Sequence, residues 1–111
     1  MEINYLELTG TVLEVSPLRY SPTNIPHRRW LLEHRSKQLE AGRLRQIICQ
    51  IAVQFSGEVF AEICDPVRPG ARVSVQGFLA RTSHKSLPTQ LVFHGQTVKI
   101  LELFPIEGER K

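Results

Sequence analysis

Positive side chains are concentrated in one part of the chain. Residues 19–45 hold seven lysines and arginines against two glutamates, a net charge of +5, whereas the whole chain carries +3. The seven are Arg19, Arg28, Arg29, Arg35, Lys37, Arg43 and Arg45. Such a cluster is typical of a surface that binds a polyanion, and it is equally compatible with a solvated charged loop.

The cysteines, histidines and acidic residues do not have the spacing of a metal site or a catalytic centre. Cys49 and Cys64 are far from any metal-binding pattern, and Cys49 falls in an apolar run, where we expect a buried free thiol. His27 and His34 have no partner cluster, so we interpret them as structural hydrogen-bonding residues. A nucleophile elbow and a glycine-rich phosphate loop are both missing from the sequence. We therefore expect a binding protein that is not an enzyme and needs no metal or cofactor.

Hydrophobic residues alternate with a period of two, which predicts strands rather than helices. Five strands are expected: one around Leu6–Val12, then residues 26–36, 46–55, 73–79 and 91–100. Gly10 and Gly95 lie inside strands, where a glycine often marks a bulge or a sharp bend. Polar loops are expected at residues 37–42 and 81–89, and residues 58–64 are ambiguous.

The alternation also separates a core face from an outer face. In the third strand Ile47, Cys49, Ile51, Val53 and Phe55 share one parity, and the glutamine-rich set 46, 48, 50, 52 and 54 shares the other. The first set is predicted to face the core. In the second strand the parity of Trp30 predicts core or dimer packing, and that of Arg35 predicts exposure.

Five strands with internal glycines predict a small all-β barrel. The OB-fold is a five-stranded Greek-key barrel that binds oligonucleotides on its second and third strands, and we favour it over an SH3-like barrel, which the pattern also allows. We expect one domain over residues 1–104 and a flexible tail at 105–111. The amino-terminal residues do not resemble a signal peptide, and no apolar run approaches a membrane span.

Several short motifs make the chain similar to a known family. They include Ser21-Pro22-Thr23-Asn24-Ile25-Pro26-His27, Leu32-Glu33-His34-Arg35-Ser36, Glu40-Ala41-Gly42 and Val75-Gln76-Gly77-Phe78. With Gly10-Thr11-Val12 and Pro17-Leu18-Arg19, they cover nearly the whole chain. The sequence resembles the primosomal replication protein N family. That family comprises homodimeric OB-fold proteins that bind single-stranded DNA.

The resemblance implies a set of DNA-binding residues. Arg35 matches a binding arginine of the family, Arg45 matches a basic residue at the start of the third strand, and Lys85 lies in a later basic loop. Two positions depart from the family, because Arg43 and Ile48 stand where aromatic residues can occur. The full set expected to contact single-stranded DNA is Arg19, Arg29, Arg35, Lys37, Arg43, Arg45, Ile48 and Lys85.

The resemblance further implies a role in replication restart. We expect a cytoplasmic bacterial homodimer, associated with the nucleoid during restart, that contacts and stimulates the primosomal helicase and works with other primosome proteins, without a membrane. Fewer aromatic platforms predict salt-dependent binding through phosphates. The alternatives are a mainly protein-binding primosome adaptor with weak affinity for single-stranded DNA, and an RNA-binding OB module.

Overall fold

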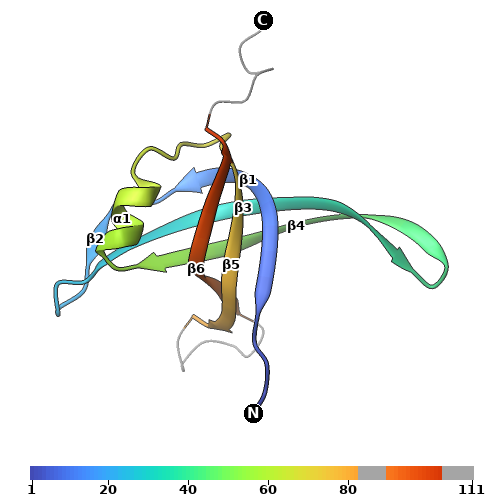
Figure 1. The fold of residues 1–111 in the computed structure, drawn as a ribbon, viewed down its shortest axis with the longest axis horizontal. Helices are drawn as coiled ribbons and strands as arrows, with labels where there is room; N and C mark the ends of the chain where they lie inside the picture. The colour runs from blue at the N-terminus through green and yellow to red at the C-terminus, as the bar shows by residue number, and fades with distance from the viewer. Residues whose placement is uncertain (83–89, 104–111) are drawn as a thin grey trace, which may run out of the picture.

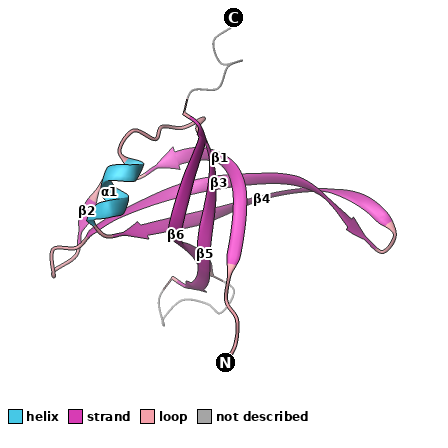
Figure 2. Cartoon of the chain, in the orientation of Figure 1, coloured by secondary structure: helices cyan, strands magenta, loops and turns pink. Residues whose placement is uncertain are grey.

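The computed structural model describes residues 1–82 and 90–103, and most of these residues are in strands (Figures 1 and 2). A period-two pattern has become six strands, of which one is only two residues long. The elements are β1 (Leu6–Val15), β2 (Arg19–Tyr20), β3 (Pro26–Glu40), β4 (Arg43–Ser56), α1 (Glu58–Cys64), β5 (Arg72–Arg81) and β6 (Leu91–Glu102).

The five long strands close into a barrel. Their order is β1-β5-β6-β4-β3, and an additional pairing between β3 and β1 closes the circle. Every pairing is antiparallel except that of β4 with β6, where Val53 lies opposite Phe93 and Gln54 opposite His94. This is the Greek-key arrangement of the OB-fold, so the fold predicted from the strand pattern is confirmed.

The core contains the residues of inward parity near the centre of each strand. Trp30 is 1% exposed and meets the ring of Phe55 edge-on, with the ring centroids 4.6 Å apart. The prediction that Trp30 packs in the core is confirmed. Leu32, Val53, Val73 and Val75 are also fully buried.

The segment that was ambiguous in sequence is the helix α1, which packs against β3 and β4 at one end of the barrel (Figure 1). The ring of Phe60 lies 5.4 Å from that of Phe55, which joins the helix to the core. Cys64, the last residue of the helix, is fully buried, and burial raises the pKa of its thiol to about 12. The thiol therefore stays protonated, and Cys64 behaves as a small apolar core residue.

The two glycines predicted to mark bulges differ in what they do. The register of β5 and β6 shifts between Gln76 and Gly77, which lies opposite Gly95, so the bulge predicted near Gly95 is confirmed. No bulge lies at Gly10; the shift between β1 and β3 falls between Val12 and Glu14. Gly10 is needed for another reason, because a β-carbon there would collide with the backbone of the adjacent β3.

Strands β3 and β4 continue far beyond the barrel as a two-stranded hairpin (Figure 1). The pairing of β1 with β3 ends at Glu33, so the rest of β3 is hydrogen-bonded to β4 alone. A two-residue turn at Ala41 and Gly42, both with positive φ, joins the strands. The loop expected at residues 37–42 is therefore mostly strand.

Cys49 lies in this projecting part of β4 and is exposed, which corrects the expectation of a buried thiol. Strand parity is continuous from Phe55 back to Cys49, but the core stops at Ile51, which is half-buried. Residues of inward parity beyond that point have no barrel beneath them. We call residues 34–49 the projecting hairpin.

Candidate nucleic-acid interface

One face of the β3–β4 ribbon gathers four of the predicted DNA-binding residues. The register pairs Arg35 with Ile48, Lys37 with Gln46, and Arg29 with Gln54. Residues directly opposite each other in a sheet place their side chains on the same face. Arg29, Arg35, Lys37 and Ile48 therefore share one surface, which we call the outer face because it is opposite to the face carrying Trp30.

Arg35 is held in position without being neutralised fully. Its Nε atom donates a hydrogen bond of 3.1 Å to Oε1 of Glu33, and its side chain is 61% exposed. The terminal nitrogens of the guanidinium have no partner in the described residues and can donate to a phosphate. Lys37 is exposed two residues further along the same face.

Apolar side chains lie on the same face towards the tip. Leu39 pairs with Leu44 across the two strands, and the two are 73% and 67% exposed. Ile48, 51% exposed, adjoins Arg35. These three residues offer flat apolar contact to a base or to a partner protein, but they lack an aromatic ring.

Arg43 and Arg45 lie on the opposite face of the hairpin. The two-residue turn pairs Arg43 with Glu40 and Arg45 with Gln38, so both arginines have the parity of Ile47 and Cys49. Arg45 forms an ion pair with Glu40. The expected set of binding residues is thus divided between the two faces of the hairpin.

Arg19 and Arg29 meet where the ribbon joins the barrel. Arg19 pairs with His27 through the short β2, and both arginines line a depression of about 220 Å³. Nη2 of Arg29 donates to Oε1 of Gln54 at 2.7 Å, which holds the guanidinium over β4. The charged surface therefore continues from the hairpin onto the barrel.

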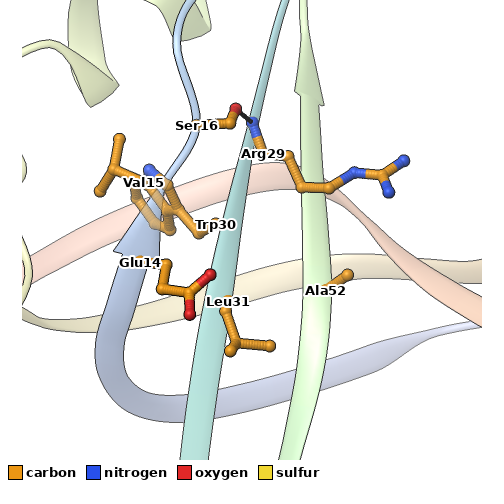
Figure 3. Close-up of a pocket in the computed structure, with 7 residues that line it drawn as sticks. All are labelled: Glu14, Val15, Ser16, Arg29, Trp30, Leu31 and Ala52. Carbon is orange, nitrogen blue, oxygen red and sulfur yellow. Dashed lines mark hydrogen bonds between the residues drawn. The ribbon is translucent and has the colours of Figure 1, made fainter.

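A second depression lies beside Arg29, between the end of β1 and β3 (Figure 3). Its volume is about 250 Å³, and Val15, Leu31 and Ala52 contribute an apolar wall. The amide of Arg29 donates to Oγ of Ser16 at 2.9 Å, which ties the two sides of the depression together. The apolar wall can contact a nucleobase, whereas the carboxylate of Glu14, which lines the same depression, disfavours a phosphate within it.

A stacked ring pair on β5 and β6 was not predicted from the sequence. The rings of Phe78 and His94 are nearly parallel, at 11°, with centroids 5.0 Å apart. His94 also lies opposite Gln54 of β4, so the pair adjoins the outer face. Burial lowers the pKa of His94, and the positive charge of Arg29 lowers it further. The outward parity of both rings on adjacent strands was the available signal.

Lys85 and the tail at 105–111 lie outside the described residues. Within residues 1–82 and 90–103, no group of three metal-ligating side chains is found. None of the described helices is both long enough and apolar enough to span a bilayer.

Comparison with known proteins gives the family of the chain. A family described as "another single-strand binding protein family" matches residues 4–97. Replication restart protein PriB of Erwinia tasmaniensis is 34% identical over 102 residues, which cover 92% of this chain and 97% of the relative. The protein of the same name from Photorhabdus laumondii is 35% identical over the same shares of the two chains.

Solved structures agree with this assignment. The structure of PriB from Ralstonia solanacearum has a TM-score of 0.79 and 33% identity, and the match covers 91% of this chain and 100% of that one. A single-stranded DNA-binding protein from Thermus aquaticus has a TM-score of 0.73 at 21% identity over 90% of this chain and 50% of that one, which supports the fold alone. The chain is thus a member of the single-strand binding protein family and, within it, of the replication restart protein PriB family.

Proposed function

We propose that this protein binds single-stranded DNA on the outer face of the β3–β4 ribbon during replication restart. The observation that carries the proposal is the register, which places Arg29, Arg35, Lys37 and Ile48 on one surface. A basic strip with apolar contacts between its cations can follow a phosphate backbone while bases rest against the sheet. The role in replication restart is proposed because the relatives are named replication restart proteins.

Binding is expected to depend more on phosphates than on stacking. Ile48 cannot offer the face of an aromatic ring, a contact that contributes roughly 1–3 kcal/mol per base. Each phosphate neutralised on a single strand steepens the salt dependence of log K by about 0.7. Recognition through the backbone also predicts little preference between base sequences.

Fluorescence anisotropy tests the proposal. Labelled dT oligomers and a duplex of equal length are titrated with protein at low and moderate salt. We expect binding that favours the single strand and weakens steeply as salt rises. Equal affinity for the duplex, or an affinity that salt leaves unchanged, would contradict the proposed interface.

The homodimer and the contact with the primosomal helicase also belong to this proposal. Exposed Leu39 and Leu44 at the tip support a protein contact, because a water-exposed apolar pair on a projecting ribbon is suited to burial by a partner. Exposed Ile3 and Tyr5 near the amino terminus offer apolar area to a second subunit. The bacterial relatives are consistent with action in the cytoplasm, on the nucleoid and beside other primosome proteins.

A separate experiment tests the helicase contact. Leu39→Ser with Leu44→Ser should reduce stimulation of the primosomal helicase on a forked DNA by several-fold, because both apolar partners are lost. Thr23→Ala, an exposed change in the distant loop, is the matched control. Full stimulation by the double variant would move the helicase contact to another surface, and sedimentation velocity of the wild-type protein tests the dimer independently.

A further inference from the structure

A recess lies where β3 leaves the barrel, at the fork between β1, β3 and β5. Thr11 of β1 pairs with Glu33 of β3 on one side and with Arg72 of β5 on the other. The buried Gly10 lies at the base of the fork, and a β-carbon there would collide with the carbonyl of Glu33. The close approach of the two strands is therefore built into the sequence at position 10.

The recess has a volume of about 250 Å³ and is lined almost wholly by polar side chains. Thr9, Thr11 and Arg72 line one wall, and residues 33–36 line the other. The side chains of Thr9, Thr11 and Arg72 make no hydrogen bond within the described residues. Three groups that can donate hydrogen bonds therefore converge on one small space without a partner.

The position of Arg72 is fixed by the turn before β5. The amide of Gly70 donates to the carbonyl of Val12 at 2.7 Å, and the amide of Val12 donates to the carbonyl of Ala71 at 2.9 Å. These bonds attach the two residues that precede β5 to β1. Glu102 lies opposite Arg72 on β6, but no ion pair joins these two residues.

The charges in the recess leave one unit to be neutralised. Arg35 and Arg72 contribute two positive charges, and Glu33, which binds Nε of Arg35, contributes one negative charge. A single phosphodiester would complete the balance, with threonine hydroxyls donating to its oxygens. On the opposite wall, His34 and Ser36 are bonded to each other at 2.8 Å, and His34 also bonds the carbonyl of Thr9, so this wall is held rigidly.

We propose that the fork binds a backbone phosphate of single-stranded DNA between Arg35 and Arg72, and so carries the strand from the hairpin onto β5. This inference rests on the proposed function and adds a contact on a strand that the basic segment 19–45 does not include. Arg72 follows a turn with no other positive feature than Arg68, so charge clustering in the sequence does not single it out.

The test measures dT-oligomer affinity across a salt series for the wild type and for the exposed-site variants Arg72→Ala and Arg72→Lys. Lys99→Ala removes the same charge from an exposed site on β6 outside the recess and is the matched control. We expect Arg72→Ala to weaken binding on the order of fivefold and to lower the salt slope by about 0.7, the value for one phosphate. Arg72→Lys should retain the slope, and Lys99→Ala should stay within about twofold of the wild type in affinity.

The outcomes separate the fork from the function on which it rests. If Arg35→Ala weakens binding and Arg72→Ala does not, the outer face stands and the fork proposal is overturned. Equal losses in Arg72→Ala and Lys99→Ala would indicate diffuse electrostatics and overturn it too. A wild-type protein that binds no single strand would overturn both proposals. For each variant, a urea midpoint and a sedimentation coefficient unchanged from the wild type exclude misfolding as the cause of weaker binding.

Discussion

Two parts of the same pair of strands have opposite surroundings. Within the barrel, Trp30 and Val53 lie opposite each other and are buried, and β3 is bonded to β1 as well as to β4. In the projecting hairpin, Leu39 and Leu44 also lie opposite each other, but both are largely exposed. The inward face of the two strands supplies a core within the barrel, whereas the outer face of the hairpin leaves an apolar pair exposed to solvent. Stability and binding should therefore respond to different substitutions.

The largest effect is expected from truncating the core. Trp30→Ala removes a fully buried ring that packs edge-on against Phe55, and should lower the free energy of unfolding by about 3–5 kcal/mol. Urea unfolding followed by circular dichroism measures this. Leu39→Ala in the hairpin is the matched control and should cost less than about 0.5 kcal/mol. A large loss from Leu39→Ala would show that the hairpin is buried, for example by a second subunit.

The second-largest loss of stability is expected from replacing the glycine at the barrel bulge. Gly77→Ala places a β-carbon against the backbone of His94, so strand β6 must shift, and we expect a loss of about 1–3 kcal/mol. Gly42→Ala at the tip has open space around the new methyl group, and its cost comes only from the positive φ of 77°. An equal or larger loss from Gly42→Ala would mean that the turn, rather than the barrel, limits stability.

Ile48→Trp should improve DNA binding without changing the barrel. The position is half-exposed and adjoins Arg35, so an indole there can stack on a base that the guanidinium anchors through its phosphate. The gain of roughly 1–3 kcal/mol per stacked base corresponds to about 5- to 150-fold tighter binding. Anisotropy with dT oligomers measures the gain, and Cys49→Trp, on the other face, serves as the control. Equal gains at both positions would contradict a one-sided interface.

A smaller effect is expected from single arginines on the two faces of the hairpin. Arg35→Ala should weaken binding to single-stranded DNA by about fivefold and lower the salt slope by about 0.7. Arg45→Ala should weaken it less, because Arg45 faces the other way and is paired with Glu40. The same anisotropy series compares them. A greater loss from Arg45→Ala would place the DNA on the opposite face.

The pH dependence of stability gives the smallest expected effect. Burial, with a further contribution from Arg29, lowers the pKa of His94 below its ordinary value of 6.5. The unfolded chain therefore takes up a proton at His94 more readily than the folded chain does. The stability that comes from keeping His94 neutral is complete above pH 6.5 and is lost as the pH falls below it. His94→Gln should flatten the dependence of urea unfolding between pH 7.5 and 5. An unchanged slope in that variant would assign the dependence to other groups.

Much of the barrel could be predicted from strand parity. The alternation from Ile51 to Phe55, and the position of Trp30 within β3, identify core residues because a closed sheet buries one face of every strand. Parity does not say where the barrel ends, which is why Cys49 was expected in the core. The extent of a projecting hairpin depends on which strands remain alongside it, and β1 stops pairing at Glu33 through contacts distant in sequence.

The candidate site was predicted less completely, because charge clustering ignores the direction of side chains. The turn at Ala41 and Gly42 has two residues, so odd-numbered residues of β3 lie beside even-numbered residues of β4. Arg43 and Arg45 share the parity of Ile47, a signal that the sequence contained. The sequence contains the outward parity of Phe78 and His94, but it does not show which residues lie beside them. The neighbours of Phe78, His94 and Arg72 depend on the order of the strands, which a local pattern does not reveal.

The parallel pair that joins β4 to β6 bears on how the protein folds. Strands β3 and β4 are neighbours in the chain, and they can pair from their turn outward on the microsecond timescale of an isolated hairpin. Val53 and Phe93 are partners across β4 and β6, but α1 and β5 lie between them in the sequence. Closing that long loop loses conformational entropy before the contacts of the core form to offset the loss. We therefore expect closure of the barrel to limit the folding rate. The long arm that extends into solvent would then be formed early, as the template onto which the remaining strands assemble.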